Sequence, residues 1–409
     1  MGNLGVYIQV PFCQTKCTYC NFHTGVVSPG RFAPYAAAVC QEIANYRALL
    51  KFSGITVSSS INSPTQTVDT VYVGGGTPSL LEPELLTEML LALRASFACA
   101  FTEVTLEADP ETIDAEKAAQ WAAIGFNRIS FGTQSFVDEE LKAAGRMHRR
   151  DDIYRAVPIL RAAGIRKISF DLIAGLPKQT DASWWQSLSE AIALGPEHIS
   201  IYMMEIDEGS RLGLEVLQSG SRYSARDLPS EESMAEFYEL AQAELKAAGY
   251  VQYEISNWAK PGFESRHNLK YWRRDPYLGF GAGAHSFSGT QRWANRHDAA
   301  AYVAAISEVK SAIESVDAVT PALALEEEFF LGLRRLSGID LGRIERQYGV
   351  SLAEKVAELA SRGMVEKDGG NLRLPANKLS ISNEVIVELL RSVPVAARSA
   401  RQRPNPALQ

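Results

Sequence analysis

Basic charge is scarce in this chain of 409 residues, because 41 Lys and Arg stand against 48 Asp and Glu and give a formal net charge of −7. A broad surface for nucleic acid or for an anionic membrane therefore has little support. No apolar run approaches the roughly 18 residues of a membrane span, and residues 1–13 lack the basic start and apolar core of a secretory signal. The composition predicts a folded cytoplasmic protein, long enough for one large domain and a smaller one.

Cysteine is scarce as well, because the chain has only five and is therefore not built on a disulfide scaffold. Three of the five, Cys13, Cys17 and Cys20, follow a predicted strand directly. Three thiols in one loop can hold one metal centre, and a 4Fe-4S cluster with three protein ligands leaves its fourth iron open to another chelator. Cys40 and Cys99 stand inside helical patterns and are expected to pack in the core.

A structural zinc site that adds His23 is the alternative interpretation of this cysteine loop. Such sites normally pair two short cysteine hooks across a separate loop, whereas here all three thiols share one loop, so we favour iron and sulfide. A ferredoxin-type electron carrier would need a fourth cysteine nearby, and Cys40 and Cys99 stand alone elsewhere in the chain.

Up to about residue 206, short β-branched or aromatic runs alternate with helix-period segments, as in βα units around a parallel sheet. Six such units predict an α/β barrel or partial barrel, although a doubly wound sheet would alternate similarly. Ligands gather at the carboxyl ends of such strands, where Glu107, Gln134 and Asp171 stand. The expected strands are Val6–Val10, Thr70–Val73, Glu103–Ala108, Arg128–Gly132, Lys167–Ile173 and His198–Glu205, and two expected helices are Pro83–Phe97 and Asp151–Ala163.

The second half of the chain departs from this alternation. Residues 251–320 are dense in Tyr, Trp, Gly and His and are expected to connect a barrel core, 1–250, with a C-terminal domain, 321–393. In that domain, helical patterns precede the hairpin signal Asp368-Gly-Gly-Asn371, and together they suggest a winged helix. We also expect Lys51–Gln66 to be a surface insertion, Tyr253–Asn257 to be the final strand with its loop, and 394–409 to be a flexible tail.

A winged helix raises the question of nucleic-acid binding. Over Thr320–Gln409 there are 13 Lys and Arg against 11 Asp and Glu, so the net charge is only +2. A basic reading helix is not evident, and the run Glu326–Glu328 would repel phosphate. We therefore expect no nucleic-acid partner and interpret the domain as a cap over the barrel or a docking surface.

The cysteine spacing resembles that of a known family. Cys-x-x-x-Cys-x-x-Cys, Tyr19 before the last cysteine and the upstream Tyr7–Phe12 resemble the radical S-adenosylmethionine (SAM) superfamily, and more narrowly its branch that contains oxygen-independent coproporphyrinogen III oxidase. The resemblance implies a partial TIM-like barrel of six βα units. It also implies that Cys13, Cys17 and Cys20 hold a 4Fe-4S cluster, that SAM binds the open iron, and that the reduced cluster can split SAM.

Further positions match residues that contact SAM in this family. The run Gly74-Gly75-Gly76-Thr77-Pro78 resembles the segment beside the methionyl amino group, and glycines suit it because the backbone can approach a ligand closely. Glu107 matches a carboxylate that accepts hydrogen bonds from SAM, and Gln134, Arg146 and Asp171 match polar residues around the adenosyl groups, where some members hold a second SAM. Residue type alone would favour solvated loop acids for Glu107 and Asp171, a turn residue for Gln134 and a helix-terminal charge for Arg146, and the cysteines upstream reverse this preference. The SAM contacts implied by the resemblance are Tyr7, Gly74, Gly75, Gly76, Thr77, Glu107, Gln134, Arg146 and Asp171.

Two functions compete within this branch. Members that oxidise coproporphyrinogen III carry a further cysteine two residues after the third, and in this chain that position is Phe22. They also have an N-terminal extension that helps to enclose the substrate, whereas this chain begins almost directly at its first expected strand. The resemblance therefore favours the haem-chaperone branch, whose members bind haem and deliver it to an acceptor protein, and disfavours the oxidase of porphyrin biosynthesis.

The segment from His267 to Trp272 resembles the His-Asn-x-x-Tyr-Trp motif that is associated with haem binding in the chaperone branch. Imidazole is an ordinary axial ligand of haem iron, and Tyr271, Trp272 and Trp258 offer aromatic surface. Replacing His267 is then expected to alter the Soret band, and the competing interpretation is a hydrogen-bonded core histidine. The nearby cations that could meet the haem propionates are Arg266, Arg273 and Arg274.

The partners implied by the resemblance are haem and an unidentified haem-acceptor protein. Homodimerisation and transient contact with membrane-bound haem proteins are both compatible with the sequence. His285 follows a Gly-rich turn that we interpret as structural. No role is expected for the remaining histidines, which are His23, His148, His198 and His297.

Overall fold

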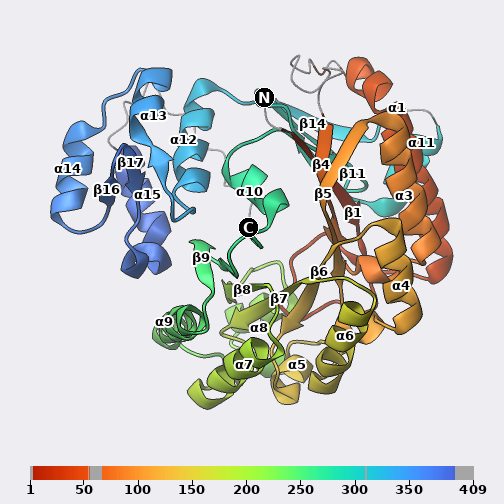
Figure 1. Ribbon diagram of the computed structural model, residues 1–409, viewed down its shortest axis with the longest axis horizontal. Coiled ribbons are helices and arrows are strands. Elements are labelled where there is room, and N and C mark those ends of the chain that lie inside the picture. The colour runs from red at the N-terminus through yellow and green to blue at the C-terminus, as the bar shows by residue number, and fades with distance from the viewer. Residues whose placement is uncertain (1–2, 54, 56–66, 309–310, 392–409) are drawn as a thin grey trace.

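The structure is a computed structural model that describes residues 3–53, 55, 67–308 and 311–391 (Figure 1). Most of the expected surface insertion Lys51–Gln66 and all of the expected tail 394–409 lie outside these residues. Among the described helices, none combines the length and the apolar character that crossing a membrane requires.

The six expected strands are present, and they lie parallel and side by side in chain order. Along each strand, β-branched and aromatic side chains such as Val6, Val71 and Ile168 are buried at alternate positions against the helices. The side chains between them face the inside of the partial barrel. The strands are β1 (Leu4–Val10), β4 (Thr67–Gly75), β5 (Ala98–Ala108), β6 (Arg128–Gln134), β7 (Lys167–Ala174) and β8 (His198–Met203).

Helices cover the outer face of this parallel sheet (Figure 1). The two helices expected at Pro83–Phe97 and Asp151–Ala163 are confirmed as α3 and α6. Asp114 caps the start of α4 by accepting from the Lys117 N–H, and Gly125 ends it in the left-handed conformation that glycine adopts without strain. The helices are α1 (Phe32–Phe52), α3 (Pro83–Ser96), α4 (Ala115–Ile124), α5 (Asp138–Ala143), α6 (Arg150–Ala162), α7 (Asp181–Leu194), α8 (Arg211–Leu217) and α9 (Glu231–Ala247).

The aromatic connecting segment extends the sheet at both ends, which the sequence did not predict. β11 (Tyr277–Phe280) adds a seventh parallel strand beside β1, and β12 (His285–Phe287), β13 (Gln291–Asn295) and β14 (Ile313–Ala318) continue antiparallel. Tyr253 and Glu254 lie in a strand that is followed by a loop, as expected for Tyr253–Asn257, but this strand is not the final one. The chain there turns between β9 (Val251–Glu254) and β10 (Asn257–Ala259), and β10 pairs antiparallel with β8. The helices of this segment are α10 (Arg266–Trp272) and α11 (Ala299–Ser307).

The C-terminal part contains helices and a small three-stranded sheet, in which the predicted hairpin at Asp368–Asn371 is confirmed. It docks on the barrel through a partly buried ion pair of 2.6 Å between the buried Glu254 and Arg334. Figure 1 shows α10 between the barrel and this part. The boundaries at 250 and 320 stay a prediction. The elements are α12 (Pro321–Gly332), β15 (Ile339–Asp340), α13 (Leu341–Tyr348), α14 (Ala353–Ser361), β16 (Glu366–Asp368), β17 (Asn371–Arg373) and α15 (Ser382–Arg391).

Candidate functional site

The cysteine loop is a closed loop at the carboxyl end of the barrel. Cys13 ends the short strand β2 (Phe12–Cys13), which pairs with β3 (Gly25–Val26), so that the residues between them form one loop. Two backbone hydrogen bonds fix the loop at Thr18, whose N–H donates to the Ala144 carbonyl at 3.0 Å and whose carbonyl accepts from the Leu212 N–H at 2.8 Å. The loop is thus held between the end of α5 and the start of α8.

The three thiols are free and partly exposed. Burial raises the pKa of Cys13 and of Cys20 above the ordinary thiol value, so these two thiols would lose their protons on binding a metal. Within the described residues, no three Cys, His, Asp or Glu side chains surround the position of a single ion. An iron-sulfur cluster places a different demand on the loop, because each thiolate binds its own iron.

The glycine run passes beside the first cysteine with no room for a side chain. A Cβ at Gly76 would clash with the Phe12 carbonyl oxygen and would lie 3.0 Å from Cys13 Sγ. A Cβ at Gly74 would lie 2.9 Å from the Glu107 carboxyl carbon. Glycine is therefore required at both positions, and this segment leaves its backbone open to a ligand at the barrel mouth.

Glu107 faces the barrel mouth from β5, where it is bonded and not a solvated loop acid. Its Oε1 accepts from the Tyr72 hydroxyl and its Oε2 from the Gly75 N–H, both at 2.8 Å. Burial raises the pKa of Glu107 to about 7. Tyr7 on β1 stacks on Tyr72 of the neighbouring strand β4, with ring centroids 5.9 Å apart. The Tyr7 hydroxyl donates to Gln9 Oε1 at 2.8 Å.

Arg146 links the cysteine loop to the polar side of the site. It forms an ion pair with Asp109, donates to the Gly132 carbonyl at 2.8 Å, and approaches Cys17 Sγ at 3.4 Å. Sequence reasoning missed Asp109, which also accepts from the Thr77 hydroxyl at 3.1 Å. Its position directly after the third expected strand, two residues beyond Glu107, was the available signal.

Gln134 combines an unusual backbone conformation with an unpartnered side-chain oxygen. It ends β6 with φ +57°, a conformation that side chains other than glycine rarely adopt. Its Oε1 is buried and has no hydrogen-bond partner among the described residues. Asp171 accepts from Ser130 at 3.2 Å on the adjacent strand, and burial raises the pKa of Asp171 to about 6. A ligand with hydroxyl or amino groups would satisfy such acceptors.

The structure therefore brings the cysteine loop and the polar residues that the sequence singled out for SAM to the same end of the barrel. Carboxylates, an amide oxygen and a guanidinium lie at this end of the barrel, beside the backbone of the glycine run. This donor set suits a ligand with an ammonium, a carboxylate and a ribose diol.

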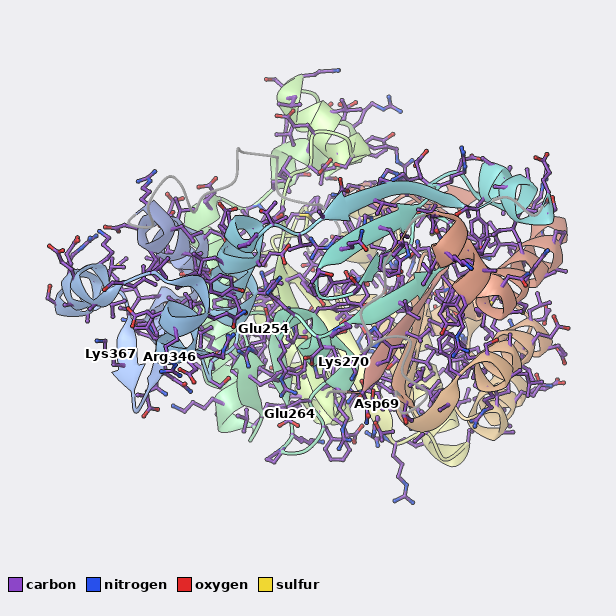
Figure 2. The ribbon with its side chains drawn as sticks, turned by 90° about the horizontal axis from the view of Figure 1, so that it is seen from above. Asp69, Glu254, Glu264, Lys270, Arg346 and Lys367 are labelled. Carbon is purple, nitrogen blue, oxygen red and sulfur yellow. The ribbon has the colours of Figure 1, made fainter. Side chains whose placement is uncertain are left out.

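The predicted haem motif forms α10, which lies against the barrel wall. His267 is 1% exposed, and both of its ring nitrogens are engaged, Nδ1 with the Thr70 hydroxyl at 3.1 Å and Nε2 with the Tyr271 hydroxyl at 2.9 Å. Burial lowers the pKa of His267 to about 3. Lys270 on the same helix pairs with Asp69 of β4 at 2.8 Å (Figure 2). In this conformation His267 could ligate an iron only after one of these hydrogen bonds breaks.

The other groups proposed for haem differ in how far they are engaged. Tyr271 and Trp272 are half-buried, and Trp258 is buried with its ring 5.8 Å from that of Tyr238. Arg274 pairs with Glu327 of α12 at 2.9 Å, so it helps to dock the C-terminal part and is not free for a propionate. Arg266 and Arg273 are exposed.

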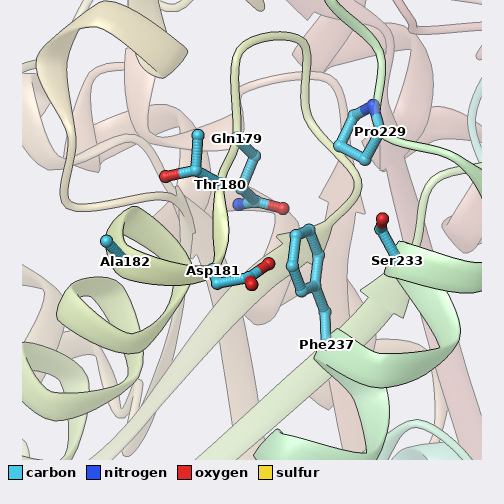
Figure 3. A pocket seen from close by; sticks show the side chains of 7 residues that line it. All are labelled: Gln179, Thr180, Asp181, Ala182, Pro229, Ser233 and Phe237. Atoms are coloured by element: carbon cyan, nitrogen blue, oxygen red, sulfur yellow. The ribbon is translucent and has the colours of Figure 1, made fainter.

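One pocket lies outside this site, at the start of α7 and against α9 (Figure 3). Its volume is about 370 Å³, and Gln179, Asp181 and Phe237 are among its lining residues. None of the residues that the sequence singled out lines it.

The chain is similar to proteins of known family. A profile described as the radical SAM superfamily matches residues 7–191, and one described as the HemN C-terminal domain matches 319–377. "Heme chaperone HemW" of Bacillus subtilis is 34% identical over 93% of this chain and 97% of that protein, and its namesake of Escherichia coli is 35% identical over 69% of each. The solved coproporphyrinogen III oxidase (HemN) of Escherichia coli superposes with a TM-score of 0.77, over 95% of this chain and 90% of that one, and at 22% identity shows a shared fold.

Proposed function

The chain belongs to the HemW family of radical SAM proteins, and from this membership we propose that it is a haem chaperone. It binds haem and a SAM-ligated 4Fe-4S cluster and transfers haem to an acceptor protein. The observation that carries the proposal is the likeness to "Heme chaperone HemW" over nearly the whole of both chains. Phe22 supports it, because a phenyl ring, 56% exposed, stands where the oxidases carry their further cysteine.

In this proposal Cys13, Cys17 and Cys20 hold the cluster and the barrel mouth holds SAM. When bound, the reduced cluster would supply an electron that can cleave SAM. Glu107 accepts from the SAM ammonium, and the unpartnered Gln134 oxygen accepts from a hydroxyl. The other proposed SAM contacts are Tyr7, Gly74, Gly75, Gly76, Thr77, Arg146 and Asp171.

Haem ligation by His267, with Tyr271 and Trp272 beside the macrocycle, stays a proposal. It requires one of the two hydrogen bonds of the ring, to Thr70 or to Tyr271, to break, because both ring nitrogens are engaged. The chaperone function itself requires only that haem is bound, whichever residue ligates the iron. The acceptor protein, a homodimer and the cytoplasmic location also stay predictions.

The test compares two incubations of the anaerobically reconstituted protein. One receives ferric haem, and the other receives coproporphyrinogen III with SAM and a reductant. We expect a haem spectrum in the first and no protoporphyrinogen in the second. Formation of protoporphyrinogen would replace the chaperone with the alternative, an oxygen-independent coproporphyrinogen III oxidase, and a failure to bind haem would also overturn the proposal.

A further inference from the structure

One face of strand β4 serves both the proposed SAM site and helix α10. Tyr72 donates to Glu107 at the barrel mouth, and its ring lies 5.3 Å from the ring of His267. Thr70 lies two residues earlier on the same face of the strand and contacts Nδ1 of His267 at 3.1 Å. The sequence did not single out Thr70, because it stands 197 residues before its partner.

The start of α10 is fixed to the barrel around this contact. The backbone N–H of His267 donates to Glu103 at 2.9 Å, and Glu103 forms a buried ion pair with Arg128 at 3.1 Å. Strand β1 also approaches the helix closely, because a Cβ at Gly5 would lie 2.9 Å from Lys270 Cδ and 3.5 Å from His267 Cε1. The imidazole is therefore held firmly on the side of its Nδ1 atom.

The two hydrogen-bond partners of the imidazole differ in their freedom to move. Thr70 is 0% exposed, and its strand is paired on both sides, with Gly5 of β1 and Glu103 of β5. Tyr271 lies in the last turn of α10 and is half-buried, with its ring edge-on to that of Tyr277 at 4.6 Å. A rotation of the Tyr271 side chain breaks one hydrogen bond, whereas a movement of Thr70 would disturb the sheet.

The chemistry of the two hydroxyl groups indicates which ring nitrogen carries the proton. Burial lowers the pKa of His267 to about 3, so the ring is neutral and has one N–H and one lone pair. A phenol is more acidic than an aliphatic alcohol and is therefore the better donor. Tyr271 then donates to Nε2, and the Nδ1–H donates to Thr70 Oγ1. The lone pair that can ligate iron lies on Nε2, where Tyr271 covers it.

We propose that Thr70 is a positioning residue for haem, because its hydroxyl holds the Nδ1–H of His267 and leaves Nε2 for the iron. The inference rests on the proposed function and on His267 as its ligand. When haem binds, the hydrogen bond from Tyr271 to Nε2 breaks, the Nε2 lone pair binds the iron, and the phenol keeps its proton. Metal-bound histidines commonly donate their other N–H to a fixed acceptor, which sets the orientation of the ring.

The first test removes the acceptor. The reconstituted full chain is titrated with ferric haem, and the Soret band reports binding. Thr70→Val keeps the shape of the side chain and should lower haem affinity about 10- to 100-fold, the range for partners of metal-bound histidines. Thr70→Ser keeps the hydroxyl and should bind haem as the wild type does. The matched control is Thr105→Val, because Thr105 is 0% exposed on β5 and its hydroxyl has no hydrogen-bond partner among the described residues.

The midpoint potential of the bound haem separates positioning from a merely structural role. An acceptor on the Nδ1–H makes the imidazole a stronger electron donor to the iron and so favours the ferric state. We therefore expect the potential, followed at the Soret band in a redox titration, to rise in Thr70→Val and to return to the wild-type value in Thr70→Ser. A loss of packing alone would not shift the potential in this pattern.

The second test removes the group that covers Nε2. Tyr271→Phe keeps the ring and deletes the hydroxyl, so haem no longer has to break a hydrogen bond to reach the nitrogen. Haem should then bind about 2- to 10-fold more tightly, the gain expected from the net free energy of one hydrogen bond. The two substitutions thus change haem affinity in opposite directions, although both delete a hydroxyl that contacts His267.

Iron and sulfide content and far-ultraviolet circular dichroism report folding for each variant. Wild-type affinity and potential in folded Thr70→Val would overturn the inference, and so would weaker haem binding by Tyr271→Phe, which carries the test alone if Thr70→Val does not fold. A wild-type Soret band in His267→Gln would also overturn it, while the chaperone function would stand. If the wild type binds no haem, the proposed function itself fails.

Discussion

The ion pair between Asp109 and Arg146 permits a quantitative test of how the site is built. In Asp109→Ala, the guanidinium keeps only the Gly132 carbonyl and Cys17 Sγ as partners. Removing one member of a buried pair costs about 3–5 kcal/mol because the other charge is left uncompensated. The Asp109 and Arg146 side chains are 18% and 10% exposed, so water can partly replace the carboxylate. We therefore expect the free energy of unfolding to fall by about 3 kcal/mol, the lower end of that range.

A double-mutant cycle separates this cost from other effects of the substitution. Asp109→Ala, Arg146→Met and the double variant are unfolded in urea without cluster and under reducing conditions, and tryptophan fluorescence reports the transition. The double variant should recover much of the loss, because neither charge is then buried alone. Independent sites give a coupling free energy below about 0.5 kcal/mol. Such a value would refute the claim that the ion pair with Asp109 holds Arg146 in place.

Three further predictions follow from contacts at the site and at the docking surface. Gly76→Ala should lower the iron and sulfide bound per chain after reconstitution, because the new Cβ clashes with the Phe12 carbonyl oxygen and such overpacking costs about 1–3 kcal/mol. Iron and sulfide contents equal to those of the wild type would contradict this prediction. Glu107 has a raised pKa of about 7, so its contribution to stability is present below its unfolded-state pKa and is lost as the pH rises through 7. The ionised form of Glu107 accepts hydrogen bonds from SAM in the proposed function, so SAM affinity, measured by equilibrium dialysis, should rise as the pH rises through 7. If the same rise occurs in Glu107→Gln, another group causes the pH dependence. Glu254→Ala should lower the free energy of unfolding by about 3 kcal/mol, the lower end of the range for a buried pair, because Arg334 loses its buried partner but is 29% exposed, so water can partly replace the carboxylate. A urea midpoint equal to that of the wild type would exclude this role.

Most of the parallel sheet could be predicted from local patterns. The runs at Val6–Val10 and Lys167–Ile173 are rich in β-branched residues and are bounded by polar segments, so their type and approximate ends follow from sequence. The additions at the two ends of the sheet could not be foreseen, because β11 pairs with a strand more than 260 residues earlier. Cys99 shows the same limit: it was expected in a helix and lies in β5, where it packs against the core.

The candidate site divides in the same way. Residue types and spacing singled out the cysteines, the glycines and Glu107, because these motifs are local. The partner of Arg146 was missed, since Asp109 and Arg146 are 37 residues apart and only the fold brings them together. His267 shows the converse case, because the motif identified it but only packing reveals that both ring nitrogens are engaged.

The way the large sheet ends has a consequence for solubility. β9 is an outermost strand, and the C-terminal part covers it: the Ile255 N–H donates to the Arg334 carbonyl and the Leu336 N–H to the Tyr253 carbonyl. The opposite outermost strand, β14, bears exposed acidic side chains that disfavour edge-to-edge pairing with a strand of another chain. A chain truncated before α12 would expose unpaired backbone N–H and C=O groups at the β9 edge. Strands of neighbouring chains would then tend to pair with this edge, and the protein would aggregate.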